Sequence, residues 1–182
     1  MFALAETALP GCFEIRPPVF DDARGRFVKL FHREMFAERG LATEFPEQYC
    51  SHSHRDVVRG LHFQTPPHDH AKLVYCLVGE VFDVVLDLRV GSPTWGRTAS
   101  LTLSAERANG LYVPKGLAHG FCATSDTALL VYDVETVHAP KNDAGVLWSS
   151  VDVDWPTAAP IVSPRDAAFP TLAEFESPFR HG

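Results

Sequence analysis

Residues 72–88 read KLVYCLVGEVFDVVLDL, and this stretch decides the fold class. Two runs rich in Val, Leu, Tyr and Phe, 72–77 and 80–88, lie on either side of a turn at Val78-Gly79-Glu80. In the second run Asp83 and Asp87 fall on one face of the chain, while the other face carries Phe82, Val84, Leu86 and Leu88. Alternation with a period of two is typical of a β-strand. The stretch therefore predicts two consecutive strands joined by a tight turn.

Similar short runs continue along the chain. Further strands are predicted at 98–103, 110–114, 120–123 and 128–136, and Gly91 and Pro93 mark a turn before the first of them. Fourteen prolines and twelve glycines leave little room for long helices. Short helices are expected only at 32–40, where Gly40 is a fitting C-terminal stop, and at 172–175. Many short strands between turns indicate an all-β sandwich or small barrel, and we expect a double-sheet jelly roll.

The length of 182 residues fits one domain with terminal arms. We expect a single domain over 1–182, in which 1–50 form an N-terminal arm and strands that contribute to a dimer. Residues 51–150 then form the jelly-roll core, and 151–182 form a C-terminal arm. Prolines at 160, 164, 170 and 178 predict that this last segment is extended and wraps the body.

The charge and the cysteines restrict the class of protein. A net charge of −7 and an isoelectric point near 5.7 argue against a general nucleic-acid binder, which needs a basic face. Four scattered cysteines without a Cys-x-x-Cys motif predict reduced thiols. The first residues lack the basic start of a signal peptide, and no apolar run approaches the roughly 18 residues of a membrane span. We therefore expect a cytoplasmic protein that is not associated with a membrane.

Two histidine motifs raise the question of a metal. His68-x-His70 has the local shape of a metal-ligand pair, but Lys72 follows where a carboxylate ligand would be expected. Pro114-x-Gly-x-x-His119 keeps the spacing of a second ligand motif and indicates that His119 lies at the mouth of the barrel. We expect no catalytic metal and no cofactor.

A different pattern combines a histidine with a lysine. Residues 59–64 read RGLHFQ, and Lys72 lies ten residues after His62. Such a pair can remove a proton from a carbon beside a carbonyl and stabilise the resulting enolate. Taken alone, His62 is more often a buried structural histidine, and Asp166 a turn or helix cap.

These strings, in order, resemble the dTDP-4-dehydrorhamnose 3,5-epimerase family, sugar-nucleotide epimerases with a cupin-type jelly roll. The resemblance extends over nearly the whole chain and includes DDARGRF at 21–27, RGLHFQ at 59–64, KLV at 72–74, PKGLAHGF at 114–121 and SPRD at 163–166.

The resemblance implies a role for each of four residues. His62 would be the general base that removes the proton beside the C4 keto group, and Asp166 would bind its other ring nitrogen. Lys72 would face the enolate oxygen, and Tyr132 would return a proton from the opposite face of the sugar.

The resemblance also implies how the substrate is bound. Arg24 and Arg59 would bind the diphosphate, because guanidinium groups match phosphate oxygens. Arg24 would reach the neighbouring subunit of a homodimer through an exchanged N-terminal strand. Further contacts to the nucleotide sugar are expected from Gln48, His119, Lys29, His138 and Arg165.

The chain departs from the family at the nucleotide end of the site. Lys29 stands where the family commonly has Glu, and Val137-His138 stands where it commonly has an aromatic pair. Thymine, cytosine and guanine therefore stay open as bases, as do C3, C5 or both as the inverted centres. Two other functions are a 3,4-ketoisomerase, which typically lacks the RGLHFQ string, and a non-catalytic sugar-binding cupin module, which has no use for both an acid and a base.

Overall fold

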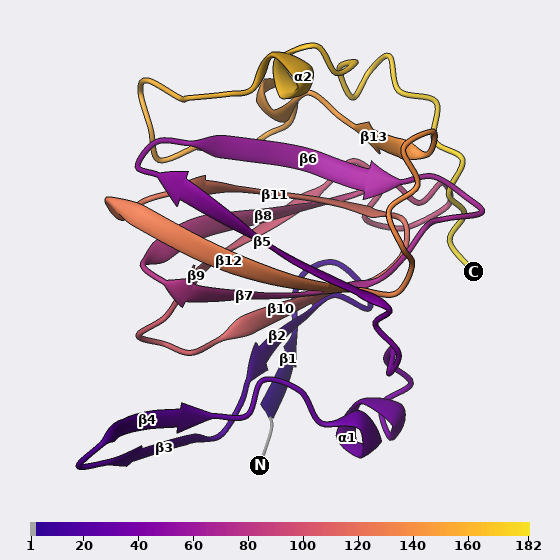
Figure 1. Ribbon diagram of the computed structural model, residues 1–182. Coiled ribbons are helices and arrows are strands. Elements are labelled where there is room, and N and C mark those ends of the chain that lie inside the picture. The colour runs from indigo at the N-terminus through magenta and orange to yellow at the C-terminus, as the bar shows by residue number, and fades with distance from the viewer. Residues whose placement is uncertain (1–2) are drawn as a thin grey trace.

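Two antiparallel sheets face each other in the computed structural model, which describes residues 3–182 (Figure 1). The larger sheet has the strand order β1-β2-β10-β7-β12-β5. Its strands are β1 Ala3–Glu6, β2 Phe13–Arg16, β5 Glu47–His54, β7 Lys72–Val78, β10 Gly110–Val113 and β12 Thr127–Val134. The smaller sheet has the order β13-β6-β11-β8-β9. Its strands are β6 Val58–Gln64, β8 Glu80–Asp87, β9 Thr98–Ser104, β11 Leu117–Ala123 and β13 Asp143–Gly145.

This arrangement confirms the expected jelly roll. Strands β7 and β8 follow each other in the chain but lie in different sheets, so the turn at Gly79 leads from one sheet to the other. Gly79 has a φ of +74°, a backbone conformation that glycine adopts at little cost. The predicted alternation along β8 is also present, but both faces of the strand are buried. Asp83 and Asp87 face the interior between the sheets, together with Val81 and Val85 of the main core.

The N-terminal part contributes to the larger sheet and also extends away from it. Strands β1 and β2 pair with each other, and β2 pairs with β10. A separate hairpin, β3 Val19–Asp22 and β4 Gly25–Val28, extends to one side below the sandwich, and α1 Arg33–Ala37 lies below the sandwich on the other side of the N-terminus (Figure 1). Gly40 follows α1 with a φ of +67°, as expected for a residue that ends a helix.

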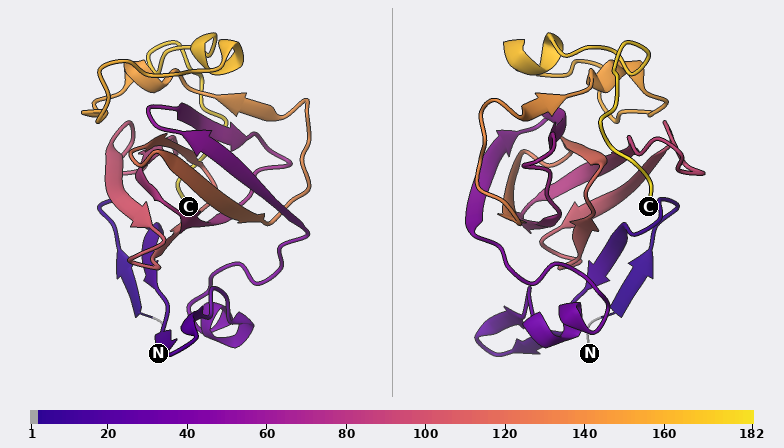
Figure 2. Two further views of the ribbon diagram at one scale, coloured as in Figure 1. Left: turned by 60° about the vertical axis from the view of Figure 1, so that its left-hand side comes forward. Right: turned by 90° about the vertical axis from the view of Figure 1, so that its right-hand side faces the viewer.

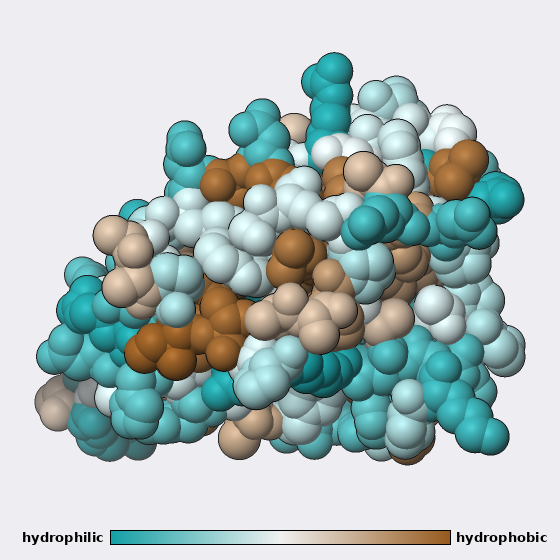
Figure 3. Space-filling view, turned by 90° about the horizontal axis from the view of Figure 1, so that it is seen from above, coloured by the Kyte–Doolittle hydropathy of each residue, from teal (hydrophilic) through white to brown (hydrophobic). Residues whose placement is uncertain are grey.

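The C-terminal segment lies over the outer face of the smaller sheet (Figure 2). Phe175 and Phe179 pack edge-on against Phe63 of β6, with ring centroids 5.2 Å and 5.5 Å apart. Two short helices occur here, the 3₁₀ helix η1 Trp148–Ser150 and α2 Pro164–Ala167. Seen from this side, the surface is mostly hydrophilic with small separate apolar patches (Figure 3).

The helix expected at 172–175 is wrong, because the chain forms only a turn there. Glu174 accepts hydrogen bonds from the backbone and side chain of Thr171, which resembles a helix start. Pro178 then follows after four residues, so a helix cannot continue. Helix α2 forms earlier, where Pro164 occupies the first turn and the Ser163 side chain accepts from the Asp166 backbone N–H.

All four cysteines are free, as expected, and Cys12, Cys76 and Cys122 are buried. Within residues 3–182, no helix combines the length and the apolar character that crossing a membrane would require.

Candidate active site

A cavity of about 310 Å³ opens between the two sheets. Both sheets, α2 and the loops beside them contribute to it, and residues that are distant in sequence therefore meet there. The lining residues are Glu47, Tyr49, His62, Phe63, Gln64, His70, Lys72, Val134, His138, Asp143 and Arg165.

Strand β6 carries His62 into this cavity. The strand pairs with β11, so that His62 lies opposite His119. Next to this pair the backbones of β6 and β11 come so close that a Cβ added to Gly60 would lie 2.5 Å from the Cα of Gly120. Gly60 also has a φ of +135°, a backbone conformation that residues other than glycine rarely adopt. The Arg59-Gly60-Leu61-His62 string therefore needs its glycine for a close approach of two strands.

His62 is bound to the carboxylate of Asp166. The ring Nε2 and Asp166 Oδ1 are 2.9 Å apart, and Asp166 Oδ2 accepts a hydrogen bond from the backbone N–H of Gly60 at 3.1 Å. Only 5% of the Asp166 side chain is exposed, against 28% of His62. With its proton on Nε2, the imidazole leaves the Nδ1 lone pair free to accept a proton.

The environment keeps His62 neutral. Burial lowers the pKa of His62 below the ordinary 6.5, and this effect outweighs Asp166, which favours the charged ring. The pKa of Asp166 is itself lowered, because its hydrogen bonds to His62 and Gly60 outweigh its burial. At neutral pH the pair is therefore a neutral imidazole beside a carboxylate, the state that a general base requires.

Strand β7 of the facing sheet supplies a buried cation. Lys72 is 6% exposed, and its Nζ donates to the backbone carbonyl of His62 at 3.2 Å. Burial lowers its pKa to about 8, although Asp143 and Asp83 favour the charged form. Lys72 is therefore mostly an ammonium at neutral pH, and it lies where it can stabilise a negative charge that develops beside His62.

Tyr132 reaches the interior from β12, also in the larger sheet. Its hydroxyl and that of Ser51 share a hydrogen bond of 3.3 Å, and its ring meets the edge of His119 at 6.0 Å. Burial raises the pKa of Tyr132 well above the usual 10, so the phenol keeps its proton. Because β6 and β12 belong to facing sheets, a neutral base and a protonated acid lie on opposite sides of the interior.

These features match a known family. The family model described as dTDP-4-dehydrorhamnose 3,5-epimerase matches residues 6–174. The chain belongs to the dTDP-4-dehydrorhamnose 3,5-epimerase family.

Individual members of this epimerase family resemble the chain over most of its length. The dTDP-4-dehydrorhamnose 3,5-epimerase of Shigella flexneri is 42% identical, covering 88% of this chain and 91% of the relative. A dTDP-4-dehydrorhamnose 3-epimerase of Streptomyces niveus is 41% identical, covering 94% and 84%. The crystal structure of the Legionella pneumophila 3,5-epimerase in complex with dTDP-4-keto-L-rhamnose superposes with a TM-score of 0.95 at 32% identity, covering 100% of both chains.

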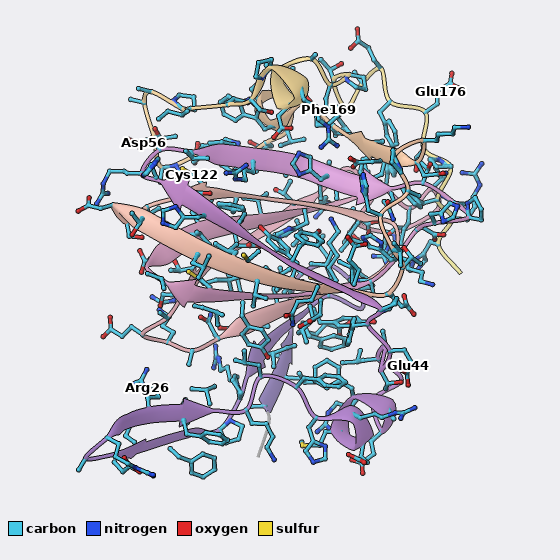
Figure 4. The ribbon with its side chains drawn as sticks, in the orientation of Figure 1. Arg26, Glu44, Asp56, Cys122, Phe169 and Glu176 are labelled. Carbon is cyan, nitrogen blue, oxygen red and sulfur yellow. The ribbon has the colours of Figure 1, made fainter. Side chains whose placement is uncertain are left out.

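Arg165 and His138, two of the expected substrate contacts, line the cavity. Arg165 lies 2.8 Å from Asp143 and over the ring of Phe169, which follows α2 (Figure 4). His138 lines the cavity, and its backbone N–H donates to the Glu47 carboxylate.

His119 lies deeper than a surface contact to the substrate would. It is 3% exposed, and its Nε2 donates to both oxygens of Asp83 at 3.0 Å and 2.9 Å. Burial raises the pKa of Asp83, and His119 opposes this effect. His119 therefore contacts the Tyr132 ring but is not among the residues that line the cavity.

The remaining expected contacts lie outside the cavity of their own chain. Arg24 and Lys29 are exposed, and Arg24 is paired with Asp22 at 2.5 Å in the projecting hairpin. Arg59 donates to the Ser53 hydroxyl at 3.0 Å and does not line the cavity. Gln48 points to the outer face of β5, where it donates to Asp133 at 2.6 Å.

Sequence reasoning missed several lining residues. Tyr49 is adjacent to Gln48 but points to the opposite face of β5. His70, considered above only as part of a metal-ligand pattern, lies in a loop and lines the cavity. Its Nδ1 is 2.7 Å from the hydroxyl of Thr136, and burial lowers its pKa to about 3.

In the part of the chain that the structure describes, no three His, Cys, Asp or Glu side chains are grouped so that they could hold a metal ion.

Proposed function

We propose that the protein inverts C3, C5 or both in a nucleotide-linked 4-keto-6-deoxy sugar, most simply dTDP-4-dehydro-6-deoxyglucose, which would yield dTDP-4-dehydrorhamnose. The observation that carries this proposal is the placement of His62 and Tyr132 on facing sheets, with Lys72 beside them. The relatives named above, which act on dTDP-linked sugars by their names, support the choice of substrate.

The first step is removal of a proton from the carbon beside the C4 keto group. Nδ1 of His62 takes the proton, and the C–H electron pair moves to form a C=C bond while the C4 carbonyl becomes an enolate. Asp166 stabilises the imidazolium through the bond to Nε2. Lys72 offers its ammonium to the enolate oxygen, a contribution that is largest in a site with little water.

The second step returns a proton to the same carbon. When the Tyr132 phenol donates it from the face opposite His62, the carbonyl re-forms and the centre is inverted. The resulting phenolate regains a proton from solvent, and His62 releases its own. When the His62 proton returns instead, the centre is unchanged and only exchange with solvent has occurred.

Two choices within this function stay open. One is a 3- or 5-monoepimerase, which a relative named as a 3-epimerase favours. The other is the nucleotide, because a histidine lines the cavity at position 138 and the family commonly has an aromatic ring there.

Solvent deuterium uptake tests the function. The protein is incubated in D₂O with dTDP-4-keto-6-deoxyglucose, and deuterium at C3 and C5 is measured by NMR together with the configuration of each centre. We expect uptake at one or both carbons. His62→Asn should lower uptake by roughly 10²–10⁴ while dTDP still binds, because a general base acts mainly in the transition state. Wild-type protein without uptake on any NDP-4-keto sugar would refute the function.

We further propose a homodimer in which the β3–β4 hairpin enters the partner's site. Phe20 and Phe27 of this hairpin are 58% and 62% exposed, and their rings lie 6.2 Å apart. Large apolar residues also line an outer groove of the larger sheet, namely Leu30, Phe31, Phe45, Leu77 and Val131. Exposed apolar surfaces of this kind mark contacts between proteins.

Mixing two variants of low activity tests whether the β3–β4 hairpin of one subunit enters the site of the other. Arg24→Ala and His62→Asn would each lower activity as homodimers. After mixing and subunit exchange, a heterodimer has one site with both defects and one with neither, so activity should recover. Light scattering establishes the oligomeric state. A monomer, or a mixture with no recovery despite proven exchange, would contradict the proposal.

A further inference from the structure

Tyr49 places a second phenol ring directly against Tyr132. The two residues lie opposite each other in the antiparallel pair of β5 and β12, so their side chains share the interior face. Their ring centroids are 4.9 Å apart and their planes differ by 19°, which is a stacked arrangement. The stack is therefore built into the register of two paired strands.

The two rings differ in their access to the cavity. Tyr132 is 6% exposed, whereas Tyr49 is 42% exposed. Among the described residues, Tyr49 lines the cavity with His62 and Lys72, and Tyr132 does not. The Tyr49 ring thus lies between the cavity and the ring of Tyr132.

The hydroxyl groups differ as well. That of Tyr132 is held by Ser51, whereas no hydrogen-bond partner for the Tyr49 hydroxyl is found within residues 3–182. Burial, with a smaller contribution from Glu47 and Asp143, raises the pKa of Tyr49 to about 12. Tyr49 is therefore a neutral side chain whose hydroxyl is not tied to the protein, and its ring can turn without breaking such a bond.

We propose that Tyr49 is a positioning residue that covers Tyr132 and so controls how often the enolate is protonated from the Tyr132 face. This inference rests on the proposed epimerase function. An enolate that forms at His62 has two outcomes, return of a proton from His62 or donation from Tyr132. Inversion requires that the sugar carbon come within hydrogen-bonding reach of the Tyr132 hydroxyl. The Tyr49 ring occupies part of the space through which that approach must occur, and it must turn aside.

Two substitutions separate the ring from its hydroxyl. Tyr49→Ala removes the ring and uncovers Tyr132, and Tyr49→Phe keeps the cover. In D₂O with dTDP-4-keto-6-deoxyglucose, the measured quantity is the ratio of inverted product to deuterium in the uninverted substrate. We expect this ratio to rise at least about threefold in Tyr49→Ala, within the roughly hundredfold range over which placement of reacting groups affects rate. Tyr49→Phe should keep the wild-type ratio.

Three results would overturn the proposal. An unchanged ratio in Tyr49→Ala means that the ring is no barrier. A lower ratio in Tyr49→Ala means that the stack supports Tyr132 instead of covering it. A steep loss of inversion in Tyr49→Phe means that the Tyr49 hydroxyl itself is the proton donor. Thermal unfolding of both variants confirms that each is folded at the assay temperature.

A second readout does not depend on activity. Hydroxyl-radical footprinting with peptide mass spectrometry measures the solvent access of Tyr132 in the folded protein. Oxidation of Tyr132 should be several-fold faster in Tyr49→Ala than in the wild type or Tyr49→Phe. Equal oxidation rates in all three proteins would show that the Tyr49 ring does not shield Tyr132 from solvent. If the wild type shows no deuterium uptake, the epimerase function fails, and the footprint still decides whether Tyr49 covers Tyr132.

Discussion

Asp166→Asn tests how the orientation of His62 supports proton removal. The buried carboxylate accepts two hydrogen bonds. Oδ1 accepts from Nε2 of His62 at 2.9 Å, and Oδ2 accepts from the backbone N–H of Gly60 at 3.1 Å. Asparagine has only one side-chain oxygen. Because an unsatisfied buried N–H costs about 1–3 kcal/mol, that oxygen should turn toward Gly60. The amide NH₂ then faces His62.

This orientation determines the size of the effect. An amide that donates to Nε2 forces the imidazole proton onto Nδ1, the nitrogen that should accept the substrate proton. Loss of one charge-assisted bond, worth about 1.5–3 kcal/mol, would lower the rate only roughly 10- to 150-fold. Loss of the base itself costs roughly 10²–10⁴. We expect Asp166→Asn to fall in the larger range.

The assay is deuterium uptake at C3 and C5 together with calorimetric titration of dTDP. Uptake should fall, and the affinity for dTDP should change less than about twofold, because the change affects the transition state. Asp126→Asn is the matched control, since that carboxylate is 93% exposed in an ion pair with Arg55. Asp166→Asn protein that keeps more than about 1% of the wild-type uptake would refute this account of the tautomer, because the loss would then be explained by one missing hydrogen bond.

Four other outcomes are expected. The rate should fall as the pH drops through the pKa of His62, which lies below 6.5, because the base is then protonated. It should fall again as the pH rises past about 8, where Lys72 loses its proton, and an undiminished rate up to pH 9 would contradict the Lys72 assignment. Tyr132→Phe should keep deuterium exchange but lose inversion, and inversion at the wild-type rate would assign the donor elsewhere. Prolonged chelation should leave activity unchanged, and loss reversed by one divalent ion would establish a metal site. Calorimetry with dTDP, UDP, CDP and GDP should show discrimination weaker than about a hundredfold, or about 2.7 kcal/mol, because Val137 and His138 stand where the resemblance leads us to expect an aromatic pair. A larger preference for dTDP would mean that another residue recognises thymine.

The fold was predictable because alternation is a local property. The residues of β8 that share a face follow from a period of two, and the turn at Gly79 follows from one residue. The same alternation did not reveal that Asp83 is fully buried, because both faces of β8 are covered by packing that sequence periodicity does not show. The prediction of a helix at 172–175 was wrong because it rested on a suitable start and did not take into account that Pro178 follows too closely for the helix to continue.

The site was predictable only where the chain resembles its family. His62 and Asp166 are 104 residues apart, and no local pattern brings them together. Position 49 shows the limit most clearly. Gln48 was expected in the site, yet Tyr49 lines the cavity, because neighbouring residues on a strand point to opposite faces. An error of one position along β5 therefore exchanges an interior residue for an exterior one.

The balance of charges in the cavity supports the proposed homodimer. Among the described lining residues, the lysines and arginines are Lys72 and Arg165, and the acids are Glu47 and Asp143. Arg165 is already paired with Asp143, and Lys72 is buried beside His62. A nucleotide diphosphate brings further negative charge, which these groups cannot balance. Arg24 is exposed on a hairpin that extends away from its own body, and we therefore propose that the same residue of a second copy adds positive charge to the site.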